Sequence, residues 1–265
     1  MRILFIGDIM GRPGRKALAA HLPGIISQWG PDLVIANGEN LAGGRGISRK
    51  TAKEIFAMDV EILTGGNHIW DNREGMELLA VEERIVRPLN VHPDSPGQGF
   101  LKVSVNGFNV MVVNLLGRLF MPASSDCPFR TVDSVLASNR DSSIVIVDFH
   151  AEATSEKISM GWHLDGRVSA ILGTHTHVQT ADERILPNGT AYMTDVGMTG
   201  SFSSVIGVSR HEAVKRFVTG LPVAVTDPPL EELGVNCVVI DIENTTGRAT
   251  SINRLWAGDR PATSA

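Results

Sequence analysis

Residues 170–177 read AILGTHTH, an apolar run that ends in a glycine, a threonine and two histidines separated by one residue. A short continuous apolar run predicts a buried strand with both faces covered, as in a parallel sheet flanked by helices. Alternate residues of an extended segment project to the same side, so His175 and His177 are expected to reach one site together. Both the fold class and the site depend on where else this pattern recurs.

The same pattern, an apolar run followed by residues that can bind metals, occurs four more times. Asp8 follows RILFIG, Glu39 and Asn40 follow LVIANG, Asn67 and His68 follow EILTGG, and His150 follows IVIVDF. Segments of helical composition separate the runs, for example 15–29 and 48–58, although Pro23 and Gly24 are expected to break the first of these helices. This alternation predicts an α/β fold.

Some antiparallel pairing is expected as well. Asn106 and Gly107 separate two apolar runs and predict a hairpin, while 235–242 and 249–255 resemble a final pair of strands. The expected architecture is therefore α/β, with mixed central sheets flanked by helices. Length and composition predict a single domain over residues 1–258 and a flexible C-terminal tail over 259–265.

The polar residues after the strands are expected to converge, because the carboxyl ends of parallel strands line one edge of a sheet. Each residue alone has a structural explanation: Asp8 could cap a helix, Asn67 could lie in a turn, and His150 could be a hydrogen-bonded core histidine. Together they comprise two carboxylates, two carboxamides and four imidazoles. That set exceeds one tetrahedral zinc site and suits two ions of higher coordination number, and the lack of thiolates favours iron or manganese.

Composition limits the partners. The net charge is -5 and Lys and Arg are scattered, so the chain lacks the basic stripe that extended nucleic-acid binding needs. An anionic substrate must then be held locally, by a metal, an Arg or a helix N-terminus. The apolar run at 2–7 is too short for a signal peptide or a membrane span, and Cys127 and Cys237 form no disulfide framework. These features predict a cytoplasmic protein.

At this point the residues resemble the calcineurin-like metallophosphoesterases, whose motifs run D-x-H, G-D, G-N-H, a lone H and H-x-H. The matching segments are GDIM at 7–10, GEN at 38–40, GNH at 66–68, His150, and HTH at 175–177. Two positions depart from the family: Met10 stands in place of a histidine ligand, and Glu39 in place of an aspartate. With HAEATSEK at 150–157 and TDVGMTG at 194–200, these departures resemble the YmdB-like branch, bacterial iron-binding enzymes that hydrolyse cyclic nucleotide phosphodiesters, 2',3'-cyclic ones especially.

The resemblance implies a ligand set for two divalent or trivalent ions, with iron expected and manganese as the alternative. One ion would be held by Asp8, Glu39, Asn40 and His177, and the second by Glu39 as a bridge together with Asn67, His150 and His175. Asn40 would fill the place left open at Met10. A thioether is a weak ligand for such ions, so Met10 is expected to pack and not to bind.

The implied activity is that of a dinuclear metal-dependent phosphodiesterase acting on a small-molecule cyclic nucleotide by attack of a metal-bridging hydroxide. In the family the histidine of G-N-H faces the leaving oxygen, so His68 is the candidate general acid, with orientation of a ligand as its alternative role. A metal-dependent nucleotide-binding regulatory protein without relevant catalysis is the second hypothesis. An amidohydrolase-type barrel is disfavoured, because its H-x-H pair lies on an early strand and here the pair is late.

Substrate contacts cannot be assigned from the sequence. The segment 116–131 is either a wall of the substrate pocket, a subunit contact or a packed surface loop, and it carries Arg118, Phe120, Phe129 and Arg130. Enzymes of this kind are often symmetric assemblies, so a homo-oligomer is one expectation.

Overall fold

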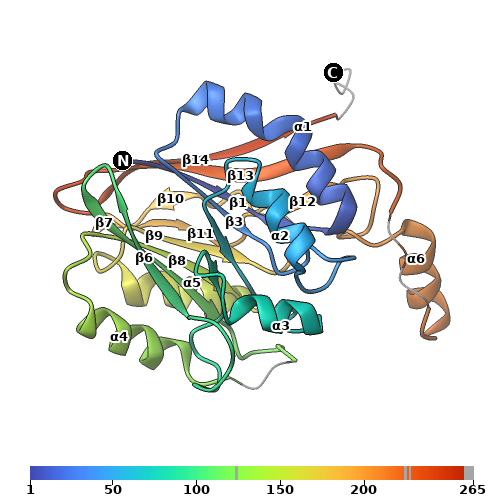
Figure 1. The fold of residues 1–265 in the computed structure, drawn as a ribbon, viewed down its shortest axis with the longest axis horizontal. Coiled ribbons are helices and arrows are strands. Elements are labelled where there is room, and N and C mark those ends of the chain that lie inside the picture. The colour runs from blue at the N-terminus through green and yellow to red at the C-terminus, as the bar shows by residue number, and fades with distance from the viewer. Residues whose placement is uncertain (123–124, 224–225, 227, 260–265) are drawn as a thin grey trace.

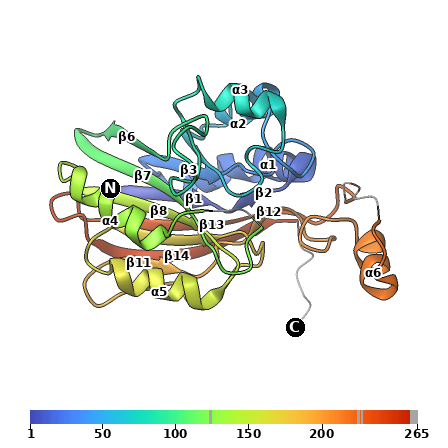
Figure 2. The ribbon, with the colours of Figure 1, turned by 90° about the horizontal axis from the view of Figure 1, so that it is seen from below.

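Two β-sheets lie face to face, and helices cover the outer face of each (Figure 1, Figure 2). The computed structural model describes residues 1–122, 125–223, 226 and 228–259. Apolar side chains of both sheets fill the space between them, for example Phe5 and Ile35 from one sheet and Val112 and Ile146 from the other. The predicted mixed sheets flanked by helices are confirmed.

The first sheet has the strand order β2-β12-β13-β1-β3-β4-β5, and β14 pairs with β13. Its strands are β1 (Arg2–Ile6), β2 (Asp8–Ile9), β3 (Leu33–Asn37), β4 (Ile62–Thr64), β5 (Ile85–Val86), β12 (Met198–Ser201), β13 (Leu233–Ile242) and β14 (Ala249–Gly258). β1, β3, β4 and β5 are parallel, whereas β13 is antiparallel to both β1 and β14. β13 and β14 are the strand pair expected near the C-terminus.

The second sheet has the order β10-β11-β9-β8-β7-β6. Its strands are β6 (Phe100–Val105), β7 (Phe108–Leu116), β8 (Ile144–His150), β9 (Ala170–Thr174), β10 (Arg184–Ile185) and β11 (Ala191–Met193). β7, β8, β9 and β11 are parallel, and β6 pairs antiparallel with β7. The hairpin predicted at Asn106 and Gly107 is confirmed, since both have the positive φ that a two-residue turn requires, 51° and 84°.

Five of the six helices in the described part of the chain form the two outer layers. The six helices are α1 (Gly11–Trp29), α2 (Arg49–Phe56), α3 (Arg73–Leu79), α4 (Pro128–Ser138), α5 (Thr154–Leu164) and α6 (Arg210–Thr219). The first three pack on the first sheet, where Leu18 and Ile55 share a core with Leu4. α4 and α5 pack on the second sheet through Val132 and Met160. α6 stands away from both sheets, at one side of the molecule (Figure 1, Figure 2).

The break expected at Pro23 is wrong, because α1 continues through it to Trp29. Pro23 and Gly24 lie on the exposed side of the helix, whereas Leu22 and Ile25 on either side of them are buried in the core. Packing of these flanking residues holds the turn together where the proline removes a backbone hydrogen bond.

The C-terminal strand β14 runs to Gly258. The tail expected at 259–265 lies outside the described residues except for Asp259, whose backbone N–H donates to the carbonyl of Leu233 at 2.9 Å. Over the part of the chain that the structure describes, no helix has both the length and the apolar character needed to cross a bilayer.

Candidate metal centre

Side chains from both sheets meet beyond the carboxyl ends of their parallel strands. Asp8 begins β2, one residue after the end of β1, Glu39 and Asn40 follow β3, Asn67 and His68 follow β4, His150 ends β8, and His175 and His177 follow β9. The structure brings the carboxylates and imidazoles of Asp8, Glu39, His150, His175 and His177 into neighbouring groups. Segments separated by more than a hundred residues therefore share one site.

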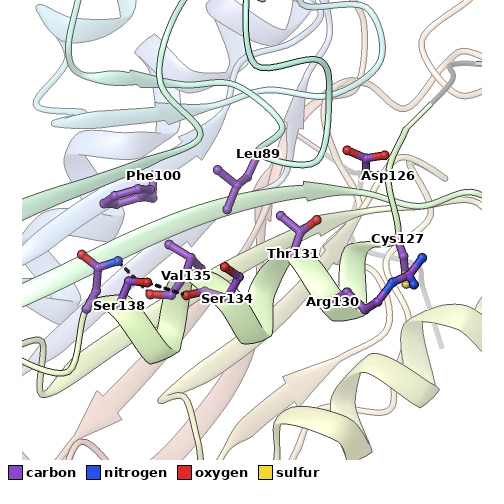
Figure 3. Close-up of a pocket in the computed structure, with 10 residues that line it drawn as sticks. Leu89, Phe100, Asp126, Cys127, Arg130, Thr131, Ser134, Val135 and Ser138 are labelled. Atoms are coloured by element: carbon purple, nitrogen blue, oxygen red, sulfur yellow. Dashed lines mark hydrogen bonds between the residues drawn. The ribbon is translucent and has the colours of Figure 1, made fainter.

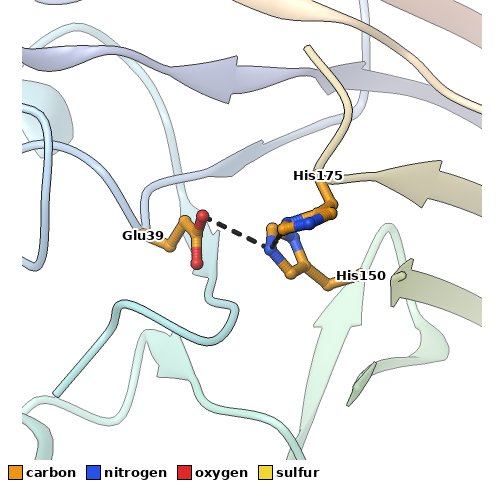
Figure 4. A group of neighbouring side chains, drawn as sticks. All are labelled: Glu39, His150 and His175. Atoms are coloured by element: carbon orange, nitrogen blue, oxygen red, sulfur yellow. Dashed lines mark hydrogen bonds and ion pairs between the residues drawn. The ribbon is translucent and has the colours of Figure 1, made fainter. Parts of the chain in front are cut away.

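Glu39 lies at the centre of this arrangement. One group consists of Glu39, His150 and His175, and Figure 4 shows the carboxylate of Glu39 pointing toward the two imidazoles. The other group consists of Asp8, Glu39 and His177. Within each group the candidate ligand atoms all lie within 4.8 Å of one another, so Glu39 is common to two potential ion sites.

The Nε2 atom of His150 is surrounded by atoms that carry lone pairs. It lies 3.1 Å from Asn67 Oδ1, 3.1 Å from His175 Nδ1 and 3.3 Å from Glu39 Oε1. One proton on Nε2 could serve only one of these three neighbours. A cation among them would satisfy all four atoms.

The other nitrogen of His150 is held by a buried hydrogen-bond chain. Thr174 Oγ1 donates to Asp148 Oδ1 at 2.7 Å, and the Nδ1 atom of His150 lies 2.9 Å from the same hydroxyl. Because the hydroxyl proton is used on Asp148, its oxygen is free to accept from Nδ1–H. This arrangement orients the ring and leaves Nε2 as the ligand atom, as is usual for histidines bound to metals.

The charges of the buried groups also indicate a need for positive charge. Burial lowers the pKa of His150, but the carboxylates of Glu39 and Asp8 outweigh this and raise the pKa to about 9. Burial raises the pKa of Glu39, yet the adjacent His150 lowers it to about 2. Burial next to His150 lowers the pKa of His175 to about 3. The carboxylates therefore favour a positive charge beside them, which a metal ion would supply.

Two buried oxygens lack a donor. Within the described residues, neither Asp8 Oδ1 nor Asn40 Oδ1 has a hydrogen-bond partner. The side-chain amide of Asn40 donates to Glu39 Oε1 at 2.8 Å, and His177 Nε2 lies 3.8 Å from Asp8 Oδ1. An unpaired buried oxygen is costly, so these atoms fit the role of ligands to a cation.

Gly66 lies against the candidate ligands, and a side chain at this position would occupy the same space as they do. A Cβ added at Gly66 would overlap the carboxylate of Glu39 and come within 2.5 Å of His150 Nε2. The donor set, the unpaired oxygens and this close approach all fit bound metal ions.

The histidine pair reaches the site in a way that the sequence did not predict. The expectation of an extended segment is wrong, because His175 and His177 have φ angles of 102° and 65°. This conformation is rare for residues other than glycine and costs free energy that the surroundings must offset. We refer to residues 175–177 as the histidine bend.

A buried ion pair holds the histidine bend. Lys157 Nζ lies 2.7 Å from Asp195 Oδ2 and donates to the carbonyl of Thr174 at 2.8 Å. Asp195 in turn accepts from the backbone N–H of Thr176 at 3.1 Å. Neither Lys157 nor Asp195 is predicted as a site residue from the sequence, although both lie in the segments 150–157 and 194–200 that carry the family resemblance.

His68 lies beside the candidate ligands and belongs to neither ligand group. Its backbone N–H donates to Glu39 Oε2 at 3.0 Å, and its Nδ1 lies 2.8 Å from Asp71 Oδ2. Its side chain lines the cavity that contains the site and is partly open to solvent. This position agrees with contact to a substrate and leaves its role as general acid a prediction.

A cavity of about 670 Å³ contains the site. Met10 lines it and packs against Gly207, where an added Cβ would come within 2.7 Å of Met10 Cε. The described residues that line this cavity include none from 116–131, so a role of that segment in substrate binding stays a prediction. Arg130 and Thr131 instead line a separate groove of about 660 Å³ beside α4 (Figure 3), and Phe129 packs edge-on against His163.

Comparison with known proteins gives concordant matches. The sequence model of the family described as YmdB-like protein matches residues 4–255. A protein of Bacillus subtilis named 2',3'-cyclic-nucleotide 2'-phosphodiesterase is 44% identical over 260 residues, which is 98% of both chains.

Two crystal structures have closely similar folds. A hypothetical protein from Thermus thermophilus superposes with a TM-score of 0.92 at 42% identity, covering 98% of this chain and 100% of the other. A structure from Mycoplasma pneumoniae described as a novel phosphatase gives a TM-score of 0.92 at 33% identity, covering 97% of this chain and 93% of the other. The likeness thus extends over nearly the whole chain in each case.

Proposed function

The chain belongs to the YmdB-like protein family, and from this premise we propose that it is a dinuclear metal-dependent phosphodiesterase that hydrolyses cyclic nucleotides, 2',3'-cyclic ones foremost. Its resemblance to the YmdB-like branch of the calcineurin-like metallophosphoesterases is confirmed by the family match. The observation that carries the proposal is the position of Glu39 in both ligand groups, since one bridging carboxylate is how a protein holds two ions close together. Because the two sheets share a core, residues 1–258 are proposed to act as one domain.

The proposed ligands are those of the two groups together with the two asparagines. Asp8, Glu39, Asn40 and His177 would hold one ion, and Glu39, Asn67, His150 and His175 the other, with iron proposed first and manganese second. Bound there, the ions would lower the pKa of a coordinated water and neutralise charge on the phosphoryl oxygens.

His68 is proposed to protonate the leaving oxygen. Asp71, at 2.8 Å from Nδ1, would orient the ring and leave Nε2 to face the cavity. As the water oxygen bonds to phosphorus and the bond from phosphorus to O2' breaks, Nε2–H would give its proton to O2'. The product is a nucleoside 3'-phosphate.

The proposed partner is a small anionic phosphodiester held by the local site. The net charge of -5 does not attract polyanions, so extended nucleic acid is not proposed as a ligand. A cytoplasmic location is proposed from the sequence features given above, and a homo-oligomer from the frequency of symmetric assemblies among such enzymes.

The first test is hydrolysis by the metal-replete protein. We expect 2',3'-cyclic AMP to be converted to 3'-AMP by the wild type, with Glu39→Gln losing bound metal and turnover together. Glu77→Gln, an exposed carboxylate on α3, is the matched control and should retain both. A replete wild-type protein that binds 2',3'-cyclic AMP without consuming it would contradict the proposal and support a nucleotide-binding regulatory protein.

The second test separates the role of His68 from metal binding. His68→Ala should retain the metal content of the wild type and lower kcat about 10²- to 10⁴-fold, the range for loss of a general acid. Unchanged kcat would refute this role. A parallel loss of metal would instead assign His68 to the support of the ligands.

A further inference from the structure

The cavity that contains the ligand groups is much larger than a phosphate requires. Its volume of about 670 Å³ lies within the roughly 300–1,000 Å³ of pockets that take whole organic ligands. Its lining includes Glu39 and His177 from the ligand groups and residues of α6. A substrate whose phosphate lies at the ligand groups therefore has room to place an organic group against α6.

Apolar and aromatic groups also line this cavity. They are Val205, Ile206 and Val208 from the loop before α6 and Phe217 from α6, which contributes the charged Glu212 and Arg216 as well. The Phe217 side chain is 83% exposed, although it is a large apolar group. An exposed aromatic ring that lines a cavity beside candidate metal ligands provides the kind of surface on which nucleobases stack.

The loop before α6 is fixed to the metal centre. The carbonyl of Ile206 accepts from His177 Nδ1 at 2.9 Å, and Ile206 has a φ of 47°, a conformation rare for a β-branched residue. Gly207 follows with a φ of 93° and lies against Met10. The hydrogen bond from His177 therefore fixes the position of this loop relative to a candidate metal ligand.

Two cationic side chains also line the cavity. Arg45 and Arg216 both line the cavity and are exposed. A guanidinium there can attract the phosphate or stack on a base, as Arg does in many nucleotide sites. The cavity lining thus combines candidate metal ligands, two cationic side chains and apolar groups.

We propose that α6 and the loop 205–208 form a nucleoside-binding wall, with the ring of Phe217 stacked on the base of a cyclic nucleotide whose phosphate lies at the ligand groups. This inference rests on the proposed function and adds that the wall recognises the nucleobase of the substrate. Because stacking strength increases with the size of the base, the wall favours purine over pyrimidine nucleotides.

The test uses substrates with and without a base. Phe217→Ala should raise KM for 2',3'-cyclic AMP about 5- to 100-fold, the range that stacking on one base provides. Hydrolysis of ribose 2',3'-cyclic phosphate, which lacks the base, should stay within about twofold of the wild type. The preference for 2',3'-cyclic AMP over 2',3'-cyclic UMP should shrink, and Phe217→Trp should restore it.

Val218 supplies the matched control. It is the next residue of α6, its side chain is 79% exposed, and it is not among the described residues that line the cavity. Val218→Ala should leave all three substrates unaffected. Equal effects of the two alanine variants, or an equal effect of Phe217→Ala on the base-free substrate, would overturn the inference.

A failure of the proposed hydrolysis can be distinguished from a failure of the nucleoside-binding wall. If the replete wild type hydrolyses none of the substrates, calorimetric binding of 3'-AMP and of ribose 3-phosphate still tests the wall. Weaker binding of 3'-AMP alone by Phe217→Ala would support it, and unchanged binding, or no binding of 3'-AMP to the wild type, would refute it.

Discussion

Replacing Lys157 with methionine tests whether the buried ion pair supports the histidine bend. Lys157 and Asp195 have side chains that are each 1% exposed, and their charged atoms lie 2.7 Å apart. Methionine keeps most of the length and apolar contact of lysine but removes the charge and the hydrogen bond to the Thr174 carbonyl. Asp195 would then remain as a buried carboxylate without its cation.

Removing one partner of a buried pair costs about 3–5 kcal/mol, because the remaining charge is uncompensated. For a chain of this size, about 1 kcal/mol shifts Tm by roughly 2–4 °C. Lys157→Met should therefore lower Tm by roughly 6–20 °C in calorimetry. It should also weaken metal affinity about 10- to 100-fold, since Asp195 holds the backbone N–H of Thr176 between the two histidines.

Two controls make the result specific. Lys102→Met removes a pair with the same 2.7 Å separation, but its side chains are 32% and 61% exposed, so we expect a cost of at most about 1 kcal/mol. In the double variant Lys157→Met with Asp195→Asn, at least half of the lost Tm should return, because no buried charge remains. If Lys157→Met lowers Tm by less than about 2 °C, or if the double variant is no more stable than the single one, the ion pair does not support the histidine bend.

Gly66→Ala should weaken metal binding at least about 10-fold, because the new methyl group overlaps the Glu39 carboxylate, and competition with a chelating dye would measure this. Gly24→Ala is the control, since Gly24 has open space around it. Equal metal affinity in the two variants would contradict the close packing at Gly66. Asp241→Asn should lower the free energy of unfolding by about 0.5–1 kcal/mol at pH 7. The hydrogen bond and charge of Arg2 lower the pKa of Asp241, so its stabilisation is present above about pH 4 and disappears as the pH falls through the folded-state pKa. Urea titrations between pH 7 and 2.5 should show the two proteins converging, and a constant difference would exclude this pair as the cause.

The strand ends could be predicted from the sequence because burial on both faces gives continuous apolar runs. In the structure these runs become β1, β3, β4, β8 and β9. The sequence could not assign each run to one of two sheets, because an apolar run has the same composition whichever neighbour it pairs with.

Local rules failed where tertiary packing decides the backbone. Pro23 is accommodated because Leu22 and Ile25 are buried on either side of it. His175 and His177 have positive φ angles in a segment where the Thr174 carbonyl accepts from Lys157 and the Thr176 N–H donates to Asp195, and both of these partners are remote in sequence. No periodicity of the chain encodes such contacts.

The cavity wall was also beyond sequence reasoning. The segment 116–131 has the aromatic and basic residues of a pocket wall, whereas the described residues that line the cavity include α6 and the loop before it. Pocket residues are defined by which loops meet in space, and composition alone does not determine this.

The most direct measurement is anomalous diffraction from crystals of the metal-replete protein, with data collected on either side of the metal absorption edge. We expect two peaks about 3.5–4 Å apart on opposite sides of the Glu39 carboxylate, one beside Asp8 and His177 and the other beside His150 and His175. A single peak, or two peaks that do not share Glu39, would contradict a dinuclear centre at this site.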